Sequence, residues 1–545
     1  MPTDISGIKN QSPVYENVDL FGSDCALQEA VAANGMEEAA VLSEFGRRWG
    51  SAEMLEQARL ANDNPPKLRA FDARGDRSDV VEFHPAYHGF MAESIAAGLH
   101  ASTWRPDASP ADAPAEVARA ARYYMVAQVE NGHMCPITMT RAAVAALATE
   151  PALAATLLPK ILSREYDSRF VPLAEKRGIT LGMGMTEKQG GTDVRANSTR
   201  ADRVGDSYRL AGHKWFMSAP MCDAFLVLAQ ARDGLTCFLL PRFRPDGSVN
   251  ALHFQRLKDK LGNRSNASTE VEFVDAFALR VGEEGKGIRT ILKMVQLTRL
   301  DCVISSAGIM RAALARAIFH CGHRSVFGKH LFDQPMMRAV LADLALESEG
   351  AVALTMRLCC AFDDAKKSAS EAAWARLMTP AAKYWICKTA PDFVYEAMEC
   401  LGGNGYVEEN TLARLFREAP VNAIWEGSGN VMCLDVLRVA KHHSDEIRGV
   451  LADLAHNTAD LPGASATATT VERMLETGGE AEARIAVELV ARLAAAACLK
   501  ASGPEIVAAA FARARLSDVR RGMWGTVALA DGERDLLLKR ALRTS

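Results

Sequence analysis

The spacing of apolar residues changes twice along the chain, and these changes limit the folds that the chain can adopt. Up to about residue 180 the apolar residues recur with a helical period, as in the alanine-rich stretches 118–128 and 141–147. Between 181 and 286 they form short runs or alternate with polar residues, and turn signals such as Pro-Asp-Gly at 245–247 separate these runs. The helical period then returns. This pattern predicts a mainly helical α+β protein with a small antiparallel β-domain in its middle.

The second helical region carries signals for helix boundaries as well as a buried face. Thr379 followed by Pro380 is typical of an N-cap and the first turn of a helix. Gly402 and Gly403 are expected to end that helix, because glycine is favoured just beyond a last turn. An earlier long helix is expected to bury one apolar face, which carries Leu300, Ile304, Ala307, Leu314 and Ile318.

In two other segments the apolar residues recur with no clear period. The first forty residues are interpreted as an extended arm that packs on other parts of the chain. Small residues dominate 461–470, which predicts a flexible connection to further alanine-rich helices. A chain of 545 residues is too long for one core. The predicted domains are 1–180, 181–286, 287–444 and 445–545.

Composition excludes several classes of protein. Hydrophobic residues make up 49% and charged residues 24%, which is ordinary for a soluble globular protein, and the reduced, mostly buried thiols expected of its cysteines fit the cytoplasm. No uninterrupted apolar run reaches the roughly 18 residues that a membrane span needs, and the first residues do not resemble a signal peptide. The 12 cysteines form no Cys-x-x-Cys pair, so reduced thiols and no metal site are expected. With a formal charge of −4, any contact with nucleic acid must be a local patch.

One carboxylate stands between apolar residues and a glycine-rich turn. This is Glu426, in the run Asn-Ala-Ile-Trp-Glu-Gly-Ser-Gly-Asn at 422–430. Partial burial raises the pKa of such a carboxylate toward the range in which it can remove a proton from carbon. The glycines let the backbone approach a planar or phosphate-bearing ligand. A plain structural turn has the same pattern, so the interpretation depends on a second motif.

That second motif is Met-Thr-Glu-Lys-Gln-Gly-Gly-Thr-Asp at 185–193. Together the two motifs resemble those of the acyl-CoA dehydrogenase superfamily of flavoproteins, in which the first cradles the flavin and the second carries the base. Lys188 stands here in place of the usual proline, and Thr192 in place of the usual serine. Further segments that resemble the family follow in the expected order, at 214–218, 260–265, 282–287, 324–328 and 401–406.

The resemblance implies an acyl-CoA dehydrogenase-like fold: an N-terminal helical domain, a middle β-domain, a four-helix bundle and here an extra C-terminal helical domain. It implies one FAD per chain, Glu426 as the catalytic base, and a homotetramer whose subunits share cofactor contacts. Arg324 is expected to bind a pyrophosphate or ribityl oxygen; its alternative is a salt bridge at a helix end. The implied cofactor-binding residues are Met183, Met185, Thr186, Gly191, Thr192, Trp215, Met217, Ser218, Arg324, Gly402, Gly403, Ile424, Gly427, Ser428 and Asn430.

Two departures from the family bear on the substrate. Gln296 stands where the dehydrogenases have an acidic residue three positions before an arginine, which weakens the case for tight coenzyme A binding. Trp425, beside the base, is bulky enough to block a long acyl chain. Both departures count against housekeeping β-oxidation. The substrate is therefore expected to be an unusual acyl-CoA or an alkylating small molecule.

The closer resemblance is to the AidB-type flavoproteins of the bacterial adaptive response to DNA alkylation. It rests on Lys188 and on the segments 64–66, 83–86, 135–140 and 425–438. It implies binding of double-stranded DNA by the C-terminal domain, through backbone phosphates and with little sequence preference. From residue 500 on, nine basic residues accompany five acidic ones. The predicted phosphate-binding stripe is Arg513, Arg515, Arg520, Arg521, Lys539, Arg540 and Arg543.

Each part of this interpretation has an alternative. The basic residues of the C-terminal domain are also what solvated helix faces with ion pairs contain. Three functions remain open: a DNA-associated FAD protein that guards against alkylating agents, a metabolic dehydrogenase for a short or branched acyl-CoA whose C-terminal domain serves assembly, and a non-catalytic DNA-binding regulator stabilised by flavin. Glu426 favours the first two, and the basic residues favour the first and the third.

Overall fold

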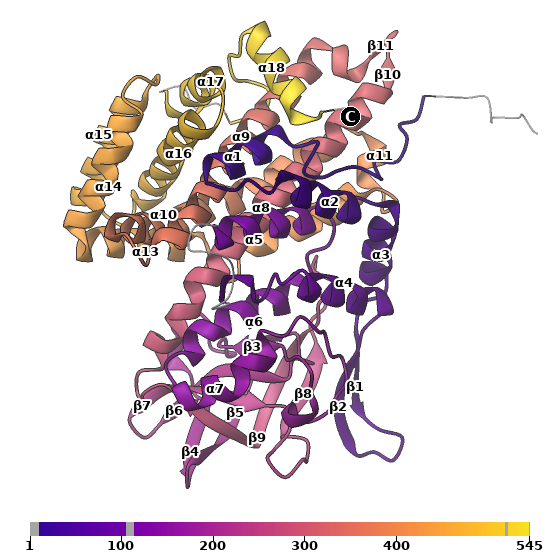
Figure 1. Ribbon diagram of the computed structural model, residues 1–545, viewed down its shortest axis with the longest axis vertical. Coiled ribbons are helices and arrows are strands. Elements are labelled where there is room, and N and C mark those ends of the chain that lie inside the picture. Colours follow the sequence, from indigo (N-terminus) through magenta and orange to yellow (C-terminus); the bar gives the residue numbers. More distant parts are fainter. Residues whose placement is uncertain (1–9, 105–113, 518–521, 544–545) are drawn as a thin grey trace, which may run out of the picture. The chain divides into compact units, whose positions relative to one another are not determined.

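The structure is a computed structural model that describes residues 10–104, 114–517 and 522–543 (Figure 1). The chain divides into two compact units. Unit 1 consists of Met1–Leu55, Asp112–Val129 and Cys302–Ser545. Unit 2 consists of Glu56–Ala111 and Glu130–Asp301.

Unit 2 is built around a seven-stranded sheet. The strand order is β3-β6-β4-β5-β9-β7, with β8 on β9, and β6 also pairs with β7. These pairings close five of the strands into a ring. The seven strands are β3 (Leu181–Gly184), β4 (Arg200–Val204), β5 (Ser207–Ser218), β6 (Ala224–Ala231), β7 (Gly234–Pro241), β8 (Leu252–Leu257) and β9 (Ser268–Val281).

Most of these pairings are antiparallel, as the sequence predicts, but β3 runs parallel to β6 and a single bridge joins β4 and β6 in parallel. A separate antiparallel hairpin, β1 (Lys67–Phe71) and β2 (Arg77–Glu82), lies in the region predicted to be helical. Two helices, α6 (Met134–Leu147) and α7 (Pro151–Ile161), share one apolar core with β3, β6 and β7. The remaining described helices of this unit are α4 (Pro85–Ala96), η1 (Ser102–Trp104), η2 (Leu173–Glu175) and η3 (Val194–Ala196).

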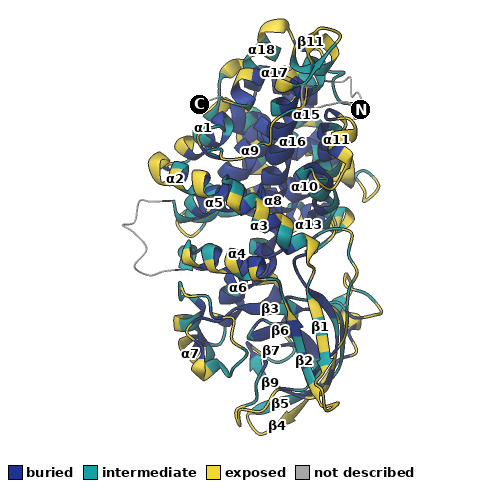
Figure 2. Ribbon diagram, turned by 90° about the vertical axis from the view of Figure 1, so that its right-hand side faces the viewer, coloured by how far each residue is buried: buried dark blue, intermediate teal, exposed yellow. Residues whose placement is uncertain are grey.

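Unit 1 is a helical bundle around long antiparallel helices. Its core helices α8 (Gly287–His323), α9 (Pro335–Asp364) and α10 (Ala369–Glu399) are buried along most of their length (Figure 2). The first turns of α8 belong to unit 2 and the rest to unit 1. By length and composition α8 could cross a membrane, but 94% of its most apolar stretch is buried within the structure. The five apolar residues predicted to share one face of α8 are all buried, which confirms that prediction.

Helix α10 starts eleven residues before the predicted boundary. Its N-cap is Ser368, whose hydroxyl accepts a hydrogen bond from the Glu371 N–H at 3.3 Å. Pro380 therefore lies inside the helix, and the prediction that Thr379 caps a new helix is wrong. Thr379 instead donates to the carbonyl of Ala375 at 2.7 Å. The middle of α10 is buried in the bundle, and this packing offsets the cost of an internal proline. The helix ends at Glu399, just before the predicted glycine pair.

The two segments without a clear period also fold into helices. The predicted arm contains α1 (Cys25–Ala33) and α2 (Ala39–Trp49), and of the described residues up to 40 those at 10–24 and 34–38 lie outside these helices. The presumed flexible connection is largely α15 (Ala464–Thr477). There the Thr469 and Thr470 hydroxyls donate to carbonyls four residues earlier, at 3.1 and 2.8 Å. Small polar residues thus satisfy their hydrogen bonds within the helix instead of breaking it.

The other described elements complete the bundle of unit 1, apart from α3 (Ala52–Asp63), which lies at the boundary of the two units. They are α5 (Ala115–Ala127), β10 (Ser325–Val326), β11 (Lys329–His330), η4 (Leu331–Asp333), α11 (Gly403–Tyr406), α12 (Thr411–Glu418), η5 (Ala419–Ala423), α13 (Gly429–His442), α14 (Ser444–Asn457), α16 (Ala483–Ser502), α17 (Glu505–Leu516) and α18 (Asp531–Ala541). None of the twelve cysteines, all of which lie in the described parts of the chain, forms a disulfide, and eleven of them are buried.

Candidate functional site

The loop at 185–193 is anchored in unit 2 by a buried ion pair. The Lys214 ammonium lies 2.7 Å from a carboxylate oxygen of Glu187, and both side chains are fully buried. Glu187 also accepts hydrogen bonds from the N–H and the hydroxyl of Ser198, at 2.7 and 2.9 Å. Burial acts to raise the pKa of Glu187, but the attraction of Lys214 and these hydrogen bonds outweigh it and lower the pKa to about 2. The acidic residue of this motif is therefore a structural anchor.

Because of this ion pair, we expect the substitution Glu187→Gln to lower the free energy of unfolding by an amount that depends on pH. Because the pKa of Glu187 is depressed in the folded state, its stabilising contribution is complete above about pH 4.5 and is lost as the pH falls toward 2. Glu187→Gln should therefore cost about 2 kcal/mol at neutral pH and progressively less in acid. Thermal unfolding between pH 7 and 3 measures this difference. Glu272→Gln removes the same charge from an exposed strand position and serves as the control. A Glu187→Gln deficit that did not shrink in acid would contradict the prediction.

The same loop leaves hydrogen-bonding groups unused. Thr186 is half-buried and Thr192 exposed, and neither hydroxyl bonds to another group within the described residues. A side chain at Gly191 would begin 2.6 Å from the Thr186 hydroxyl, so glycine keeps that hydroxyl accessible. The N–H of Trp215 donates to the Thr186 carbonyl at 2.8 Å and joins the loop to β5. The loop is thus held rigidly and presents two free hydroxyls.

The end of β5 places aromatic and cationic groups beside this loop. The Lys258 ammonium lies 3.4 Å from the ring centre of Trp215, and the Lys188 ammonium lies 5.6 Å from it. Phe216, which belongs to the segment 214–218 that resembles the family, is half exposed. The other candidates in this unit are buried or half-buried: Met183, Met185, Met217 and Ser218, whose hydroxyl is 3.0 Å from that of Ser268.

Glu426 lies in unit 1, in a tight loop between η5 and α13. Its φ is +58°, a left-handed value that few non-glycine residues adopt, and Gly427 follows at +101°. The Glu426 side chain is half-buried, Ile424 is exposed, and Ser428 and Asn430 are exposed at the N-terminus of α13. The loop therefore presents Glu426 beside the unpaired N–H groups that begin a 14-residue helix.

Two buried residues that sequence reasoning missed hold this loop. Lys383, on α10, donates to the carbonyls of Asn422 and Gly427 at 2.8 and 2.9 Å. The Asn422 side chain donates to the Ser305 hydroxyl at 3.1 Å and accepts from the Trp425 indole at 3.1 Å. Trp425, beside the predicted base, therefore has a fixed orientation. No local sequence signal marks Lys383, because its partners lie about forty residues further along the chain.

A third group of predicted residues lines one pocket of unit 1. Arg324, Gly402 and Gly403 line a cavity of about 380 Å³, together with Gln11 and His320. A Cβ added at either glycine would meet no atom within 4 Å, so a side chain there would occupy the open space. The Arg324 guanidinium donates to the backbone carbonyl of Asn10. The structure thus brings three of the predicted cofactor-binding residues, Arg324 and the glycine pair, to one cavity.

The predicted phosphate-binding stripe is not assembled as expected. Arg515 is buried between Asp343 and Glu347, and Arg540 is buried between Glu29 and Glu349. Their guanidinium groups are already bonded to carboxylates, so the prediction that these two side chains face phosphates is wrong. Arg513 is exposed but paired with Glu533, and Lys539 and Arg543 are exposed. The remaining two members, Arg520 and Arg521, lie outside the described residues.

Comparisons with known proteins identify the family. Three family models match the chain: the adaptive response protein AidB N-terminal domain at 10–168, the acyl-CoA dehydrogenase middle domain at 182–276, and the acyl-CoA dehydrogenase C-terminal domain at 285–441. The protein AidB of Escherichia coli (strain K12) is 54% identical over 433 residues, which are 79% of each chain. The chain belongs to the acyl-CoA dehydrogenase superfamily. Within that superfamily it carries the AidB N-terminal domain.

Solved structures of acyl-CoA dehydrogenase-like proteins show the same fold. Caenorhabditis elegans ACDH-11, in complex with C11-CoA, matches with a TM-score of 0.84 and 27% identity over 94% of each chain. The apo-form of Bd2924 matches with a TM-score of 0.81 and 28% identity, over 91% of this chain and all of the other. These matches confirm the predicted mainly helical α+β fold with its added C-terminal helices.

Members of the acyl-CoA dehydrogenase family use FAD, and the residues present here fit that cofactor. In unit 2, the hydroxyls of Thr186 and Thr192 are free to bond the polar edge of a flavin ring. In unit 1, Arg324 and two unobstructed glycines line a cavity that also contains Glu399, and the Arg324 guanidinium is the kind of donor that bonds phosphate oxygens. The donor chemistry on each unit is therefore the kind that a flavin dinucleotide requires.

Proposed function

We propose that this chain is an FAD protein of the AidB type, which binds double-stranded DNA, protects it from alkylating agents and has at most weak acyl-CoA dehydrogenase activity. The observation that carries the proposal is the match to AidB over 79% of the chain, which extends to a domain described as that of an adaptive response protein. The bulky Trp425, fixed beside Glu426, further favours a restricted substrate over a long acyl chain. We place the protein in the cytoplasm, where its DNA target lies.

The chemistry that the site supports is removal of a proton next to a thioester carbonyl. Bound FAD would accept the hydride from the neighbouring carbon. Glu426 takes the proton on a carboxylate oxygen, and the left-handed backbone at this residue fixes the direction from which the carboxylate reaches the substrate. Trp425 and the clamped loop limit the access of water and of bulky acyl groups.

Glu426→Gln tests this chemistry. The substitution keeps the size of the side chain and its hydrogen bonding but removes the base. The variant should bind FAD with an unchanged absorption spectrum and should lose acyl-CoA-driven flavin bleaching by about 10²-fold or more. Anaerobic bleaching with a panel of acyl-CoAs, repeated with an alkylating agent and with or without DNA, measures both substrate classes. Bleaching by Glu426→Gln at the parent rate would place the base elsewhere.

We further propose that the protein assembles as a homotetramer. Three large side chains are strongly exposed near the Arg324 pocket of unit 1: Phe327 (99%), Met336 (85%) and Tyr406 (79%). Apolar side chains exposed to this extent are typical of a surface that another subunit covers. A second copy on this surface would supply the cofactor whose phosphates Arg324 and the glycine pair bind.

A metabolic short- or branched-chain acyl-CoA dehydrogenase is the second candidate. The observation that favours it is the use of Arg515 and Arg540 as buried ties between the C-terminal helices and the helices α9 and α1, as in a domain that serves assembly. This function predicts rapid bleaching by one acyl-CoA and no affinity for duplex DNA. The same bleaching panel, together with a DNA-binding assay, separates the two candidates.

A further inference from the structure

Lys383 is a buried lysine whose ammonium has no carboxylate partner among the described residues. Its residue surface is 2% exposed. Its hydrogen bonds go to two backbone carbonyls. Removing an ammonium from water without a counter-ion is costly, and an apolar residue of similar length would pack there without this cost. Such a residue is expected to serve a purpose beyond filling space.

The two carbonyls belong to residues on either side of Glu426. Asn422 lies four residues before it and Gly427 directly after it. One ammonium therefore spans the loop and holds its two ends together on α10. The backbone between them includes the left-handed Glu426, a conformation that costs a non-glycine residue about 1 kcal/mol or more unless the surroundings enforce it.

The packing beneath the loop shows that α10 is its support. A side chain at Gly429 would begin 3.1 Å from Cδ of Lys388 and 3.4 Å from the ring of Tyr384, so this helix lies directly against the loop. Asn422 adds a second tie to the bundle through Ser305. Within this support, Lys383 contributes the hydrogen bonds that reach the glycine next to the proposed base.

We propose that Lys383 is a positioning residue, whose ammonium binds the carbonyls of Asn422 and Gly427 and thereby holds Glu426 in its left-handed, reactive conformation. The loop-holding role stands on the contacts alone. Its consequence for catalysis rests on the proposed function of Glu426. Lys383 does not touch the substrate in this role, so its loss should slow the proton removal without weakening substrate binding.

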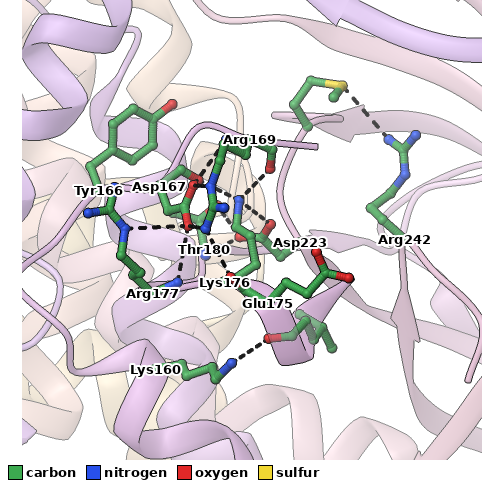
Figure 3. A network of polar contacts seen from close by, with 12 residues as sticks. Lys160, Tyr166, Asp167, Arg169, Glu175, Lys176, Arg177, Thr180, Asp223 and Arg242 are labelled. Carbon is green, nitrogen blue, oxygen red and sulfur yellow. Dashed lines mark hydrogen bonds and ion pairs between the residues drawn. The ribbon is translucent and has the colours of Figure 1, made fainter. Parts of the chain in front are cut away.

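The test compares Lys383→Met and Lys383→Arg with the parent as full-length, FAD-loaded proteins. Lys176→Met is the matched control. Lys176 lies in unit 2, is also buried and also donates to two backbone carbonyls, those of Asp167 and Arg169, but it has a counter-ion, Asp223, in the same unit (Figure 3). Hydrogen exchange of the peptide 420–430, followed by mass spectrometry, reports on the loop without any turnover. Flavin bleaching over a range of acyl-CoA concentrations reports on the reaction.

In Lys383→Met, the amides of 420–430 should exchange about 100-fold faster, since two charge-assisted hydrogen bonds are removed, while the start of α10 stays protected. The maximal bleaching rate should fall at least about tenfold, at an unchanged half-saturating acyl-CoA concentration. Lys383→Arg should retain much of the loop protection and much of the bleaching rate, because arginine keeps the positive charge and the hydrogen-bond donors. Lys176→Met should leave the loop at the parent exchange rate.

Parent-like exchange of 420–430 in Lys383→Met would overturn the proposal, and so would equal loosening of the loop in Lys176→Met. If Lys383→Met does not fold, the exchange of Lys383→Arg tests the proposal instead. Parent-like protection of 420–430 in a folded Lys383→Arg variant supports the positioning role of Lys383. Complete loss of that protection refutes it. If the parent is bleached by no acyl-CoA, the proposed reaction fails, while the exchange measurement still decides the role of Lys383.

Discussion

Arg515→Met should destabilise the bundle of unit 1 by about 3–5 kcal/mol, because it leaves two buried carboxylates without their counter-ion. The Arg515 guanidinium lies 2.5 Å from Asp343 and 2.5 Å from Glu347, which are one turn apart on α9. Burial raises the pKa of Asp343 even with the arginine present. Glu347 also accepts from the Trp385 indole at 3.1 Å, so the network joins α17, α9 and α10. Differential scanning calorimetry should show a melting temperature lower by roughly 5–10 °C.

The pH dependence of this loss has a definite sign. Burial already raises the pKa of Asp343, and without Arg515 this pKa rises further above the unfolded value, so the penalty is largest at neutral pH and declines as the pH falls through the raised value. The triple variant Arg515→Met, Asp343→Asn, Glu347→Gln carries no unpaired charge and should recover much of the stability.

Arg513→Met is the matched control, since Arg513 is on the same helix but exposed and paired with Glu533. Its loss should cost less than about 1 kcal/mol. Equal melting temperatures for the two single variants would contradict the structural role given to Arg515.

The contrast between Arg513 and Arg515 shows where sequence reasoning reaches its limit. Both lie in a basic stretch, and nothing in the local pattern separates them. What separates them is that the partners of Arg515 are 168 and 172 residues away, on a helix that packs against α17 only in the folded chain. The residue type determines the charge of a side chain, whereas the burial of that side chain depends on tertiary contacts.

The same limit applies to the proposed active-site loop. The run that contains Glu426 is recognisable because its composition is unusual over nine consecutive residues. Lys383 supports that loop from outside the run and without any such pattern, since a lone lysine in a helix is most often a solvated residue. Motifs predict the groups that meet a ligand, and they do not predict the buried groups that hold those residues in place.

The fold could be predicted from the sequence where the spacing of apolar residues is regular. The buried face of α8 repeats at helical spacing over many turns, and the alternation in the middle of the chain marks its strands. The failures lie where packing overrides a local preference: Pro380 is tolerated inside a buried helix, and the threonines of α15 bond within their own helix. The parallel pairing of β3 with β6 depends on strand order, which periodicity does not contain.

The burial of Arg515 and Arg540 changes how DNA binding must be tested. Reversal of either charge would break buried ion pairs, and any loss of DNA binding would then report unfolding. The exposed members of the predicted phosphate-binding stripe, among the described residues, are Arg513, Lys539 and Arg543, on or next to α17 and α18. The decisive variant is therefore Arg513→Glu, Lys539→Glu, Arg543→Glu, with Arg520→Glu and Arg521→Glu added in a second protein.

The triple charge reversal should weaken binding to duplex DNA by about 10²-fold or more in low salt, whatever the sequence of the duplex. Basic side chains on phosphates release counterions, so each phosphate-binding side chain that is replaced should also reduce the slope of log K against log salt by roughly 1. Assembly of several copies presents several such surfaces at once, which amplifies the effect through multivalency. Fluorescence anisotropy with duplexes of unrelated sequence, at several salt concentrations, measures both quantities.

The control must carry the same net charge on a different surface. Arg47→Glu, Arg69→Glu, Arg74→Glu makes three reversals at side chains that are 61%, 67% and 82% exposed and lie outside the C-terminal helices. This protein should keep close to parent affinity, because a local patch and not the total charge of the chain attracts the phosphates. Both variants should retain the parent's flavin spectrum and oligomer size. If the C-terminal variant binds as tightly as the parent at equal salt, the DNA surface lies elsewhere; if the control loses equal affinity, the interaction is a general effect of net charge.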